Sequence, residues 1–381
     1  MHSPAGPSRR PRAVLVGPVP PPVTGKCVMV EALGRSDLDS LDIALVGTQY
    51  SGDLGQIGRL SVGKAVEFVR TLVRTVAARV RFGARVLIHN PPAAERGLIV
   101  RDAVFLALMR PLFATVVFHV HGRGLPGGIE SLPAPLRWLA RRAFRSPDLL
   151  IAPSAATVDD CVPLQARAAV VVANGTESGR PRRDHARRDA EAFRVLYLNT
   201  ISEEKGALVL LRALARLRDS GHSVHATFAG AFRDADARTA FETAVDALGL
   251  TGSLRVPGVV VGNDKWALFD DADVFCVPSF ASYETFGLAM VEAASCALPI
   301  VLADTPGPDE VFRADESAVL VPPDDAVALA AALERLVDDG DRRAALGSAA
   351  RQVYEERYTM ERFRDRMDLA LADIDTGAGA T

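Results

Sequence analysis

Short, continuously apolar runs alternate with longer helical patterns along this chain, and that alternation limits the fold more than any other feature. In the first half the runs are RAVLVGP, LDIALVGT, ARVLIHN, TVVFHVHG, PDLLIAPS and AAVVVANG. A strand that is buried on both faces needs no polar alternation. Strands that alternate with helices form parallel sheets from βαβ units. The sequence therefore predicts an α/β fold.

The alternation stops at a charged segment, from Glu177 to Phe193, and then begins again. The later runs are RVLYLNT, SVHATFAGA, SLRVPGVV, ADVFCVPS, PIVLAD and AVLVPP. Helices are predicted between them at 205–219, 234–248, 264–271 and 325–338, with a long helical tail after them. A chain of 381 residues is long for a single core. We therefore expect two doubly wound Rossmann-like domains, residues 11–176 and 193–355, joined by a linker at 177–192.

Composition excludes several classes of protein. Hydrophobic residues make up 49% of the chain and charged residues 24%, as in a globular protein rather than a disordered one. The four cysteines form no CxxC pair, which favours the reducing cytoplasm over a disulfide framework or a zinc site. The longest apolar stretch is interrupted by Arg110 and Pro111, so no membrane span is expected.

Charge is unevenly distributed along the chain. Residues 1–192 contain 26 Lys and Arg against 16 Asp and Glu, and the remainder contains 18 against 31. A basic first half is consistent with an anionic lipid or an acidic acceptor, and equally with ordinary variation of surface charge. The segment from Arg59 to Phe82 has a cationic amphipathic pattern. We expect its apolar face to dock on the sheet, and peripheral contact with the inner face of a membrane is a further hypothesis. Nucleic acid is not an expected partner.

The loop and helix SYETFGLAMVEAAS, from Ser282 to Ser295, contain two glutamates, Glu284 and Glu292. We expect the helix to begin near Phe286, with unpaired backbone N–H groups that attract phosphate. Gly287 would let a diphosphate approach closely. An ionised carboxylate on the helix, such as that of Glu292, can accept hydrogen bonds from two ribose hydroxyls.

A second strand-to-helix loop contains Lys205 and Gly206, within LNTISEEKGALVLL. The chain has only four lysines against forty arginines, so a lysine at a helix start is notable here. The helix dipole disfavours a cation at that position, and a bound diphosphate would reverse this penalty. A solvated surface lysine is the alternative.

Two histidines, His119 and His121, follow each other in FHVHGRG at the end of a predicted strand. A histidine there can hydrogen-bond a substrate or move a proton. No third ligand accompanies the pair, so a metal site is not favoured, and a buried structural role for His119 stays open. Asp271 and Asp273 form a D-x-D, but they precede a buried strand, where capping and solvation explain them better. No metal is expected.

A fourth loop, GPVPPPVTGK, carries Gly25 at the start of a helix and lacks the dinucleotide G-x-G-x-x-G spacing. Together with PSFASYETFGLAMVEAASCALPIVLADTPGPDEVF, EEKG, HVHG and VVANGTE, this loop makes the chain resemble the retaining glycosyltransferases of family 4, which have the GT-B fold. The resemblance covers nearly the whole chain. It implies two Rossmann-like domains facing a central cleft, and a C-terminal helix, residues 356–375, that crosses back to the first domain.

The resemblance also implies roles for residues of the second domain. Glu292 would bind the nucleotide ribose, and Glu284 would act on the donor sugar hydroxyls. The backbone of Thr285, Phe286, Gly287 and Leu288 would lie beside the donor. Lys205 would hold the diphosphate and act in catalysis.

Three further positions come from the same resemblance. Gly25 would let the first-domain loop approach the diphosphate, and His121 would act in catalysis by contacting the donor sugar. Asn199 stands six residues before Lys205, where the family usually has an arginine, and is counted here with the donor-binding residues.

The function implied is transfer of a sugar from a nucleotide-diphosphate sugar to an acceptor hydroxyl, with retained configuration, front-face attack, no metal and no cofactor beyond the donor. The acceptor would be a small molecule, a glycan or a lipid-linked group. Two glutamates also suggest a glycoside hydrolase, but the helix end between them suits phosphate better. A nucleotide-sugar epimerase and a non-catalytic nucleotide-binding scaffold stay open as alternatives, and Asn199 favours the scaffold.

Overall fold

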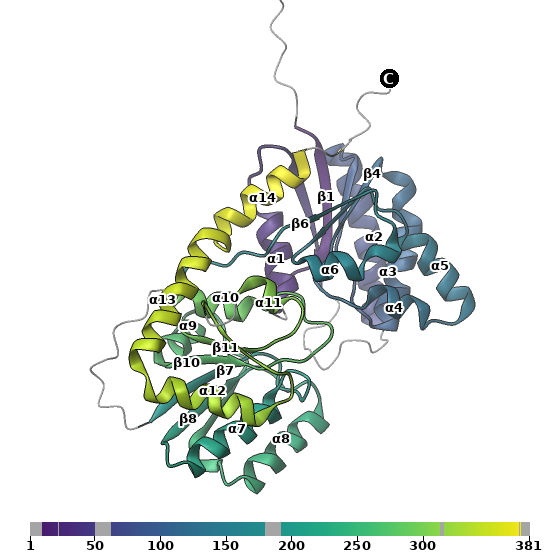
Figure 1. Ribbon diagram of the computed structural model, residues 1–381. Coiled ribbons are helices and arrows are strands. Elements are labelled where there is room, and N and C mark those ends of the chain that lie inside the picture. Colours follow the sequence, from purple (N-terminus) through teal and green to yellow (C-terminus); the bar gives the residue numbers. More distant parts are fainter. Residues whose placement is uncertain are drawn as a thin grey trace, which may run out of the picture. The chain divides into compact units, whose positions relative to one another are not determined.

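The computed structural model describes residues 10–21, 23–49, 62–179, 192–312, 316–372 and 374. It divides the chain into two compact units (Figure 1). Unit 1 contains the residues up to Ala173 together with those from Phe363 onward, and unit 2 contains Asn174–Arg362. Most of the predicted linker at 177–192 lies outside the described residues.

Unit 1 is built on a six-stranded parallel sheet in the order β2-β1-β3-β4-β5-β6. Its strands are β1 (Arg12–Pro18), β2 (Asp42–Thr48), β3 (Val86–His89), β4 (Thr115–His119), β5 (Leu149–Ala152) and β6 (Ala168–Val171). Each lies in one of the predicted apolar runs. Every residue of β3, β4 and β5 is buried, as expected of strands covered by helices on both faces.

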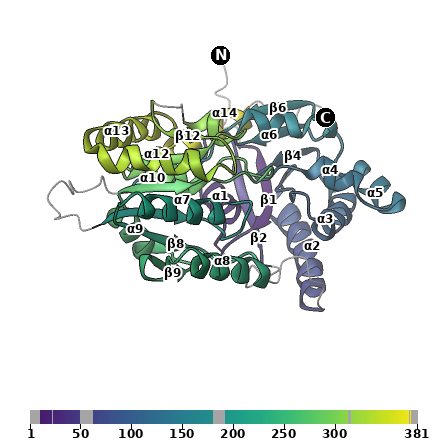
Figure 2. The same ribbon diagram turned by 60° about the horizontal axis from the view of Figure 1, so that its bottom comes forward.

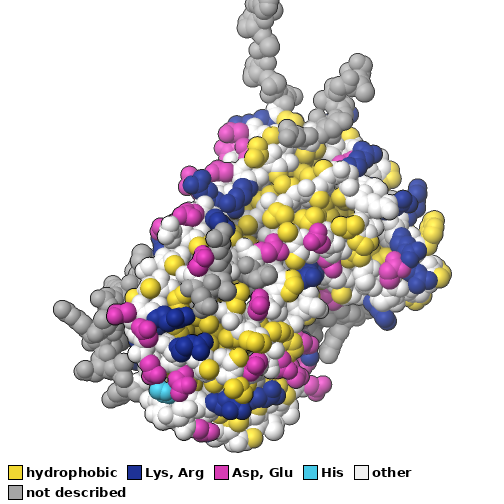
Figure 3. Space-filling model, in the orientation of Figure 1, with side chains coloured by type: hydrophobic (Ala, Val, Ile, Leu, Met, Phe, Trp, Pro, Cys, Tyr) yellow, Lys and Arg dark blue, Asp and Glu magenta, His cyan; other side chains and the backbone are white. Residues whose placement is uncertain are grey.

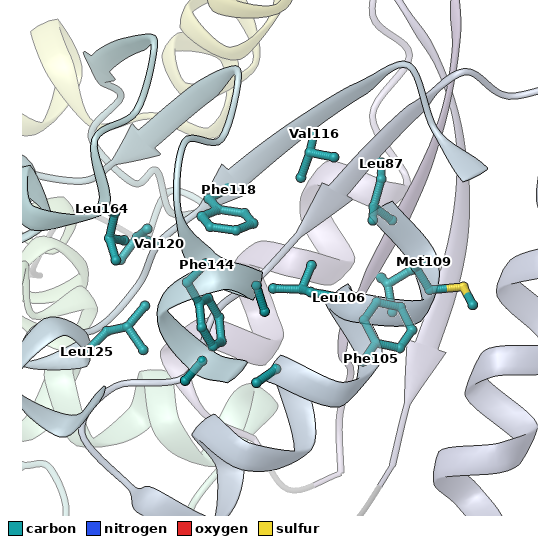
Figure 4. Close-up of a cluster of buried hydrophobic side chains, with 14 of the residues drawn as sticks. Leu87, Phe105, Leu106, Met109, Val116, Phe118, Val120, Leu125, Phe144 and Leu164 are labelled. Atoms are coloured by element: carbon teal, nitrogen blue, oxygen red, sulfur yellow. The ribbon is translucent and has the colours of Figure 1, made fainter. Parts of the chain in front are cut away.

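Helices connect these strands. They are α1 (Gly25–Gly34), α2 (Val62–Phe82), α3 (Arg96–Met109), α4 (Leu125–Glu130), α5 (Ala134–Phe144) and α6 (Ala155–Asp160), with 3₁₀ turns at η2 (Arg110–Leu112) and η3 (Val162–Leu164). The Thr24 side chain accepts a hydrogen bond from the Cys27 N–H and so caps α1. Figure 4 shows the core of unit 1, where Phe118 of β4 meets Phe144 of α5 with ring centroids 6.0 Å apart.

Unit 2 has a second six-stranded parallel sheet, in the order β12-β11-β10-β7-β8-β9. Its strands are β7 (Phe193–Leu198), β8 (Val224–Ala229), β9 (Leu254–Gly258), β10 (Val274–Val277), β11 (Ile300–Ala303) and β12 (Val319–Val321). Counted from its own first strand, the order is 3-2-1-4-5-6, as in a Rossmann fold. The strand order reverses between β7 and β10 in unit 2, and between β1 and β3 in unit 1. Ligands of such sheets bind at these reversals.

The helices of unit 2 follow the predicted spacing. They are α7 (Ala207–Asp219), α8 (Ala235–Ala247), α9 (Gly262–Asp271), α10 (Leu288–Ser295), α11 (Pro308–Val311), α12 (Ala326–Asp338) and α13 (Gly340–Arg357), with a 3₁₀ turn at η4 (Thr251–Ser253). Helices α7 and α12 lie side by side (Figure 2), and α9 packs against β7. The fold class predicted from the sequence, two doubly wound α/β units, is confirmed.

The predicted helical tail is two helices, α13 and α14 (Met360–Ala372), which meet at Tyr358 and Thr359. Thr359 forms a β-bridge with Thr176, and the Tyr358 ring packs edge-on against Phe286, 5.4 Å away. These contacts keep the chain in unit 2 as far as Arg362, whereas the crossing helix was predicted to begin at residue 356.

Within unit 1, α14 contacts residues from the first half of the chain. The backbone N–H of Ser40 donates to the Asp368 carboxylate at 2.8 Å, and Phe363 stacks on His119.

None of the described helices is both long and apolar enough to cross a bilayer. On the face shown in Figure 3, basic and acidic side chains are mixed rather than gathered by sign.

Gly347 of α13 gives a test of the packing in unit 2. A Cβ at Gly347 would lie 2.1 Å from the carbonyl oxygen of Ala297, so we expect Gly347→Ala to destabilise the protein by about 2 kcal/mol, although alanine is the better helix former. A Cβ at Gly340, in the same helix, would meet only the Arg343 side chain at 3.5 Å. Gly340→Ala should therefore leave the urea unfolding midpoint unchanged or raise it. Equal midpoints for the two variants would contradict this account.

Candidate functional site

At the reversal point of unit 2, a buried ion pair joins the loops that follow β7 and β10. The Lys205 ammonium lies 2.6 Å from the Glu284 carboxylate, and their side chains are 9% and 15% exposed. The Ser279 hydroxyl is 3.4 Å from the same carboxylate oxygen. The ammonium also lies over the Tyr283 ring, 4.5 Å from its centroid. The two residues were predicted separately, and the structure brings them into direct contact.

The backbone around Lys205 is fixed from two sides. The hydroxyl of the buried Tyr197 donates to the carbonyl oxygens of Thr200 and Lys205, at 2.8 and 3.2 Å. Gly206 has φ +78, and a Cβ there would lie 2.2 Å from the carbonyl oxygen of Pro278. Only glycine fits this close approach in a left-handed conformation. The same conformation prevents Gly206 from being helical, so α7 begins at Ala207 and not at the predicted residue 205.

The helix after β10 also begins later than predicted. Gly287 is left-handed, with φ +73, and α10 begins at Leu288 rather than near Phe286. Phe286 is 1% exposed and belongs to the core, so its side chain does not face a ligand. A contact between Phe286 and a donor is therefore limited to the backbone of Phe286. The first N–H groups of α10 lie next in the chain to the Glu284 loop, and such groups attract phosphate.

Glu292 forms a second ion pair in unit 2, which is partly buried. It is the fifth residue of α10, about one turn from the helix start rather than the predicted two, and its carboxylate lies 2.7 Å from the ammonium of Lys265 in α9. Burial raises the pKa of Glu292, although Lys265 and the Thr176 hydroxyl act in the opposite direction. Sequence reasoning missed Lys265. Its rarity was the available signal, because Lys265 is one of only four lysines.

Asn199 is the first residue after β7, and its side chain is uncharged. Its Oδ1 accepts the backbone N–H of Thr200 at 2.8 Å, so the amide stabilises its own loop.

The D-x-D aspartates lie at the opposite edge of the same sheet. Asp273 accepts the backbone N–H of Arg194 at 2.9 Å, and Asp271 is 3.5 Å from the Arg194 guanidinium. They tie together the amino ends of β7 and β10 instead of capping a helix. Among the described residues, no three His, Cys, Asp or Glu side chains are grouped as a metal site requires.

In unit 1, the loops after β1, β3 and β4 bring a lysine and histidines to one edge. The Lys26 ammonium donates to the carbonyl oxygens of Asn90 and Pro91, at 3.0 and 2.8 Å. The rings of His119 and His121 are 4.1 Å apart. Burial lowers the pKa of His119 to about 3 and also lowers that of His121, with further contributions from nearby positive charge. Both imidazoles are therefore neutral at pH 7. His119 is 1% exposed and stacks on Phe363, in line with the structural role left open for it.

A buried pair behind these histidines was not anticipated. His89, the last residue of β3, lies 3.3 Å from the carboxylate of Asp102 in α3, which also binds Arg101 at 2.6 Å. These partners depend on how α3 packs against the sheet, and no sequence motif marks them. Gly25 is the first residue of α1, at the same edge as Lys26.

Comparison with solved structures places the two doubly wound units in the GT-B fold. Sucrose-phosphate synthase from Thermosynechococcus elongatus matches with a TM-score of 0.74 at 18% identity, over 94% of this chain and 98% of that one. HepE from Anabaena in complex with UDP-glucose matches with a TM-score of 0.73 at 17% identity, over 95% of this chain and 100% of that one. Likeness at these identities defines the fold alone.

Residues 181–353 match the family model described as glycosyl transferases group 1, which agrees with the sequence resemblance. D-inositol 3-phosphate glycosyltransferase from Salinispora tropica is 38% identical over 124 residues, 32% of this chain and 25% of that protein. Phosphatidyl-myo-inositol mannosyltransferase from Mycobacterium leprae is 33% identical over 165 residues, 42% of each. The chain thus spans less than half the length of these relatives.

The raised pKa of Glu292 predicts a pH-dependent stability difference. Above the ordinary value of 4.5 the unfolded state ionises first, so folding stability falls as pH rises through the interval up to the folded-state pKa. Glutamine imitates the protonated carboxyl, so the urea midpoint of Glu292→Gln relative to wild type should increase from pH 4.5 to pH 7.5. Glu242→Gln, at an exposed position on α8, is the matched control. A Glu292→Gln difference that stays constant or decreases with pH would contradict the assignment.

Proposed function

We propose that this protein is a retaining glycosyltransferase that moves a sugar from a nucleotide-diphosphate sugar to an acceptor hydroxyl. The observation that carries the proposal is the Lys205–Glu284 pair at the reversal point of unit 2, beside the start of α10. A cation, a carboxylate and the N-terminal end of a helix together suit a sugar diphosphate. In this proposal unit 2 binds the donor and unit 1 binds the acceptor.

Donor binding would exchange partners within this site. The diphosphate competes with Glu284 for the Lys205 ammonium, and Glu284 is released to accept hydrogen bonds from sugar hydroxyls. Glu292, on the body of α10, accepts from the ribose hydroxyls. An ionised carboxylate can only accept, and hydroxyls supply the donors it needs.

The reaction proposed for this site needs no enzyme nucleophile. The bond between the anomeric carbon and the diphosphate oxygen breaks, and the acceptor oxygen bonds to the same face of that carbon. The acceptor proton passes to the departing phosphate. Lys205 and the N–H groups of α10 stabilise the negative charge that develops on the diphosphate. His121, neutral because its pKa is lowered, serves as a hydrogen-bonding group for the sugar.

A nucleotide-binding scaffold without turnover is the second candidate, and Asn199 is the observation that favours it. The neutral amide is bound to its own loop, so it adds no charge to the diphosphate site. Turnover in wild type would exclude the scaffold. An inactive wild type that gains activity in Asn199→Arg would support it.

Donor binding can be tested by thermal shift with UDP-, GDP- and ADP-sugars in the presence of EDTA. A ligand that binds only the folded state at 100 times its Kd stabilises the protein by about 2.7 kcal/mol. We expect one nucleotide to raise Tm in wild type, and Glu292→Ala and Lys205→Met to abolish most of that rise. Glu242→Ala should retain it, because that side chain is exposed on α8. No rise with any nucleotide, or a rise that requires a divalent metal, would contradict the proposal. The proton NMR coupling of the transferred anomeric position then tests retention.

We also propose peripheral contact between unit 1 and an anionic membrane surface, through α2. The apolar face of this segment was predicted to dock on the sheet. One side of α2 is buried in this way, but a second apolar side is exposed. Thr71 and Thr75 are buried, whereas a separate stripe of valines is 37–83% exposed. These valines are Val62, Val66, Val69, Val73, Val76 and Val80. Figure 2 shows α2 at the periphery of unit 1.

The charge on α2 favours lipid over a second copy of the chain as the partner. The helix carries five cations and a single acid, Glu67, which pairs with Arg70 and Arg74. Two such helices would repel each other, whereas anionic headgroups attract the cations while the valines enter the acyl boundary.

Vesicle flotation tests this contact. Wild type should float with vesicles that contain phosphatidylglycerol and not with phosphatidylcholine alone. Val69→Glu/Val73→Glu should abolish flotation, and Val327→Glu, at an exposed valine of α12, should not. Absence of wild-type binding, or a lipid-independent dimer that the double variant dissociates, would overturn the proposal.

A further inference from the structure

We propose that Lys26 forms the centre of an anion-binding subsite in unit 1, which takes a phosphate group carried by the acceptor. The inference rests on the proposed function, because it assigns the acceptor to unit 1. It adds to that function a chemical class of acceptor. It also gives a role to Lys26, the last residue of the GPVPPPVTGK loop, for which the sequence analysis predicted none.

The first observation is the position of the Lys26 side chain. Lys26 is the second residue of α1, directly after β1, and its ammonium reaches the carbonyl oxygens of Asn90 and Pro91 after β3. β1 and β3 flank the reversal of strand order, where ligands of doubly wound sheets bind. An ammonium has three donors. Two are used by these carbonyls, and the part of the chain that the structure describes offers no third acceptor.

The second observation is that the charge of Lys26 is incompletely balanced. Asp102 is the main carboxylate acting on it, but Asp102 is bound to Arg101 at 2.6 Å and lies 3.3 Å from His89. Glu95 is exposed, so solvent screens its charge. Burial lowers the pKa of Lys26 to about 8, because the nearby carboxylates offset the effect of burial only in part. The amine is still mainly protonated at pH 7, and so it serves as a cation rather than as a base.

The third observation is a set of polar atoms held around the ammonium. Asn90 donates from its amide to the His119 carbonyl oxygen at 3.0 Å and accepts Lys26 with its own carbonyl oxygen, so it joins the ends of β3 and β4 to the lysine. The ring Nδ1 of His119 is buried without a hydrogen-bond partner among the described residues, and the His119 ring is near enough to Lys26 for that positive charge to lower its pKa. A neutral imidazole carries one N–H donor, which a phosphate oxygen can accept.

These observations favour phosphate over an uncharged ligand. A neutral hydroxyl would satisfy the third ammonium hydrogen but would leave the charge unbalanced. A phosphate oxygen does both, through a charge-assisted hydrogen bond. The diphosphate of the donor is assigned to Lys205 in unit 2, and the anion at Lys26 is proposed to be a second group. Because Gly25, next to Lys26, is predicted to let its loop approach that diphosphate, the experiment saturates the donor site before phosphate is added.

The four lysines of the chain allow a residue-specific test by competitive acetylation with acetic anhydride, read by peptide mass spectrometry. Only the neutral amine reacts, so a bound anion slows the reaction by stabilising the ammonium and blocking access. With the donor site saturated by the nucleoside diphosphate that raises Tm, inorganic phosphate should slow acetylation of Lys26 at least threefold. Lys64 is the internal control, and sodium chloride at equal ionic strength controls for salt. Phosphate should also raise the Tm of wild type and of Lys64→Met. It should not raise the Tm of Lys26→Met.

The outcomes separate this inference from the proposed function. If the nucleotide protects Lys205 while phosphate leaves Lys26 unaffected, the anion subsite is wrong and the donor site stands. If the nucleotide alone protects Lys26, the lysine belongs to the donor site and the acceptor assignment is overturned. If phosphate protects Lys26 and no nucleotide protects Lys205, the subsite stands and the donor site is wrong.

Discussion

The parallel direction of the strands is the constraint on which the functional parts of this protein depend. In a parallel sheet every strand ends at the same edge, so every strand-to-helix loop emerges there. Residues far apart in sequence then become neighbours. Lys205 follows β7 and Glu284 follows β10, and their charged atoms are 2.6 Å apart. Unit 1 repeats the arrangement with Lys26 after β1 and Asn90 after β3.

The two paired lysines of unit 2, Lys205 and Lys265, share one electrostatic logic. When an ion pair is removed from water, the cost of desolvating both charges offsets most of their attraction. Breaking such a pair is nevertheless costly, because it leaves one charge without a partner. The two lysine–glutamate pairs of unit 2 therefore keep four charges balanced when no ligand is bound. A ligand that supplies an equal charge and better geometry can replace one partner at small cost. Lys26 differs, because backbone carbonyls hold it and its nearest carboxylate is shared with Arg101.

The sequence predicted the strands of both described sheets because continuously apolar runs are a clear local signal, even in β6 and β9, where no residue is fully buried. Helix starts were less accurate. α7 and α10 both begin two residues late, because Gly206 and Gly287 adopt left-handed conformations that a helical pattern does not reveal. Glu284, Glu292 and Lys205 were predicted because they stand in loops and helices that follow apolar runs, and the family resemblance then implied their roles. Lys265 was not, since its contact with Glu292 depends on how α9 packs beside α10. The exposed valines of α2 show the same limit, because periodicity alone cannot tell which of two apolar faces meets the sheet.

The contact between Gly206 and the Pro278 carbonyl has a consequence for the energetics of charge development. It leaves no room for even one methyl group between the loop after β7 and the end of β10. Steric repulsion therefore opposes any movement of one loop toward the other, and the backbone of both loops is confined even when the side chains of Lys205 and Glu284 exchange partners. Charges carried by a confined backbone need less reorganisation when a bond ionises beside them. Under the proposed function, a glycine with no side chain thus contributes to the preorganisation of its charged neighbours.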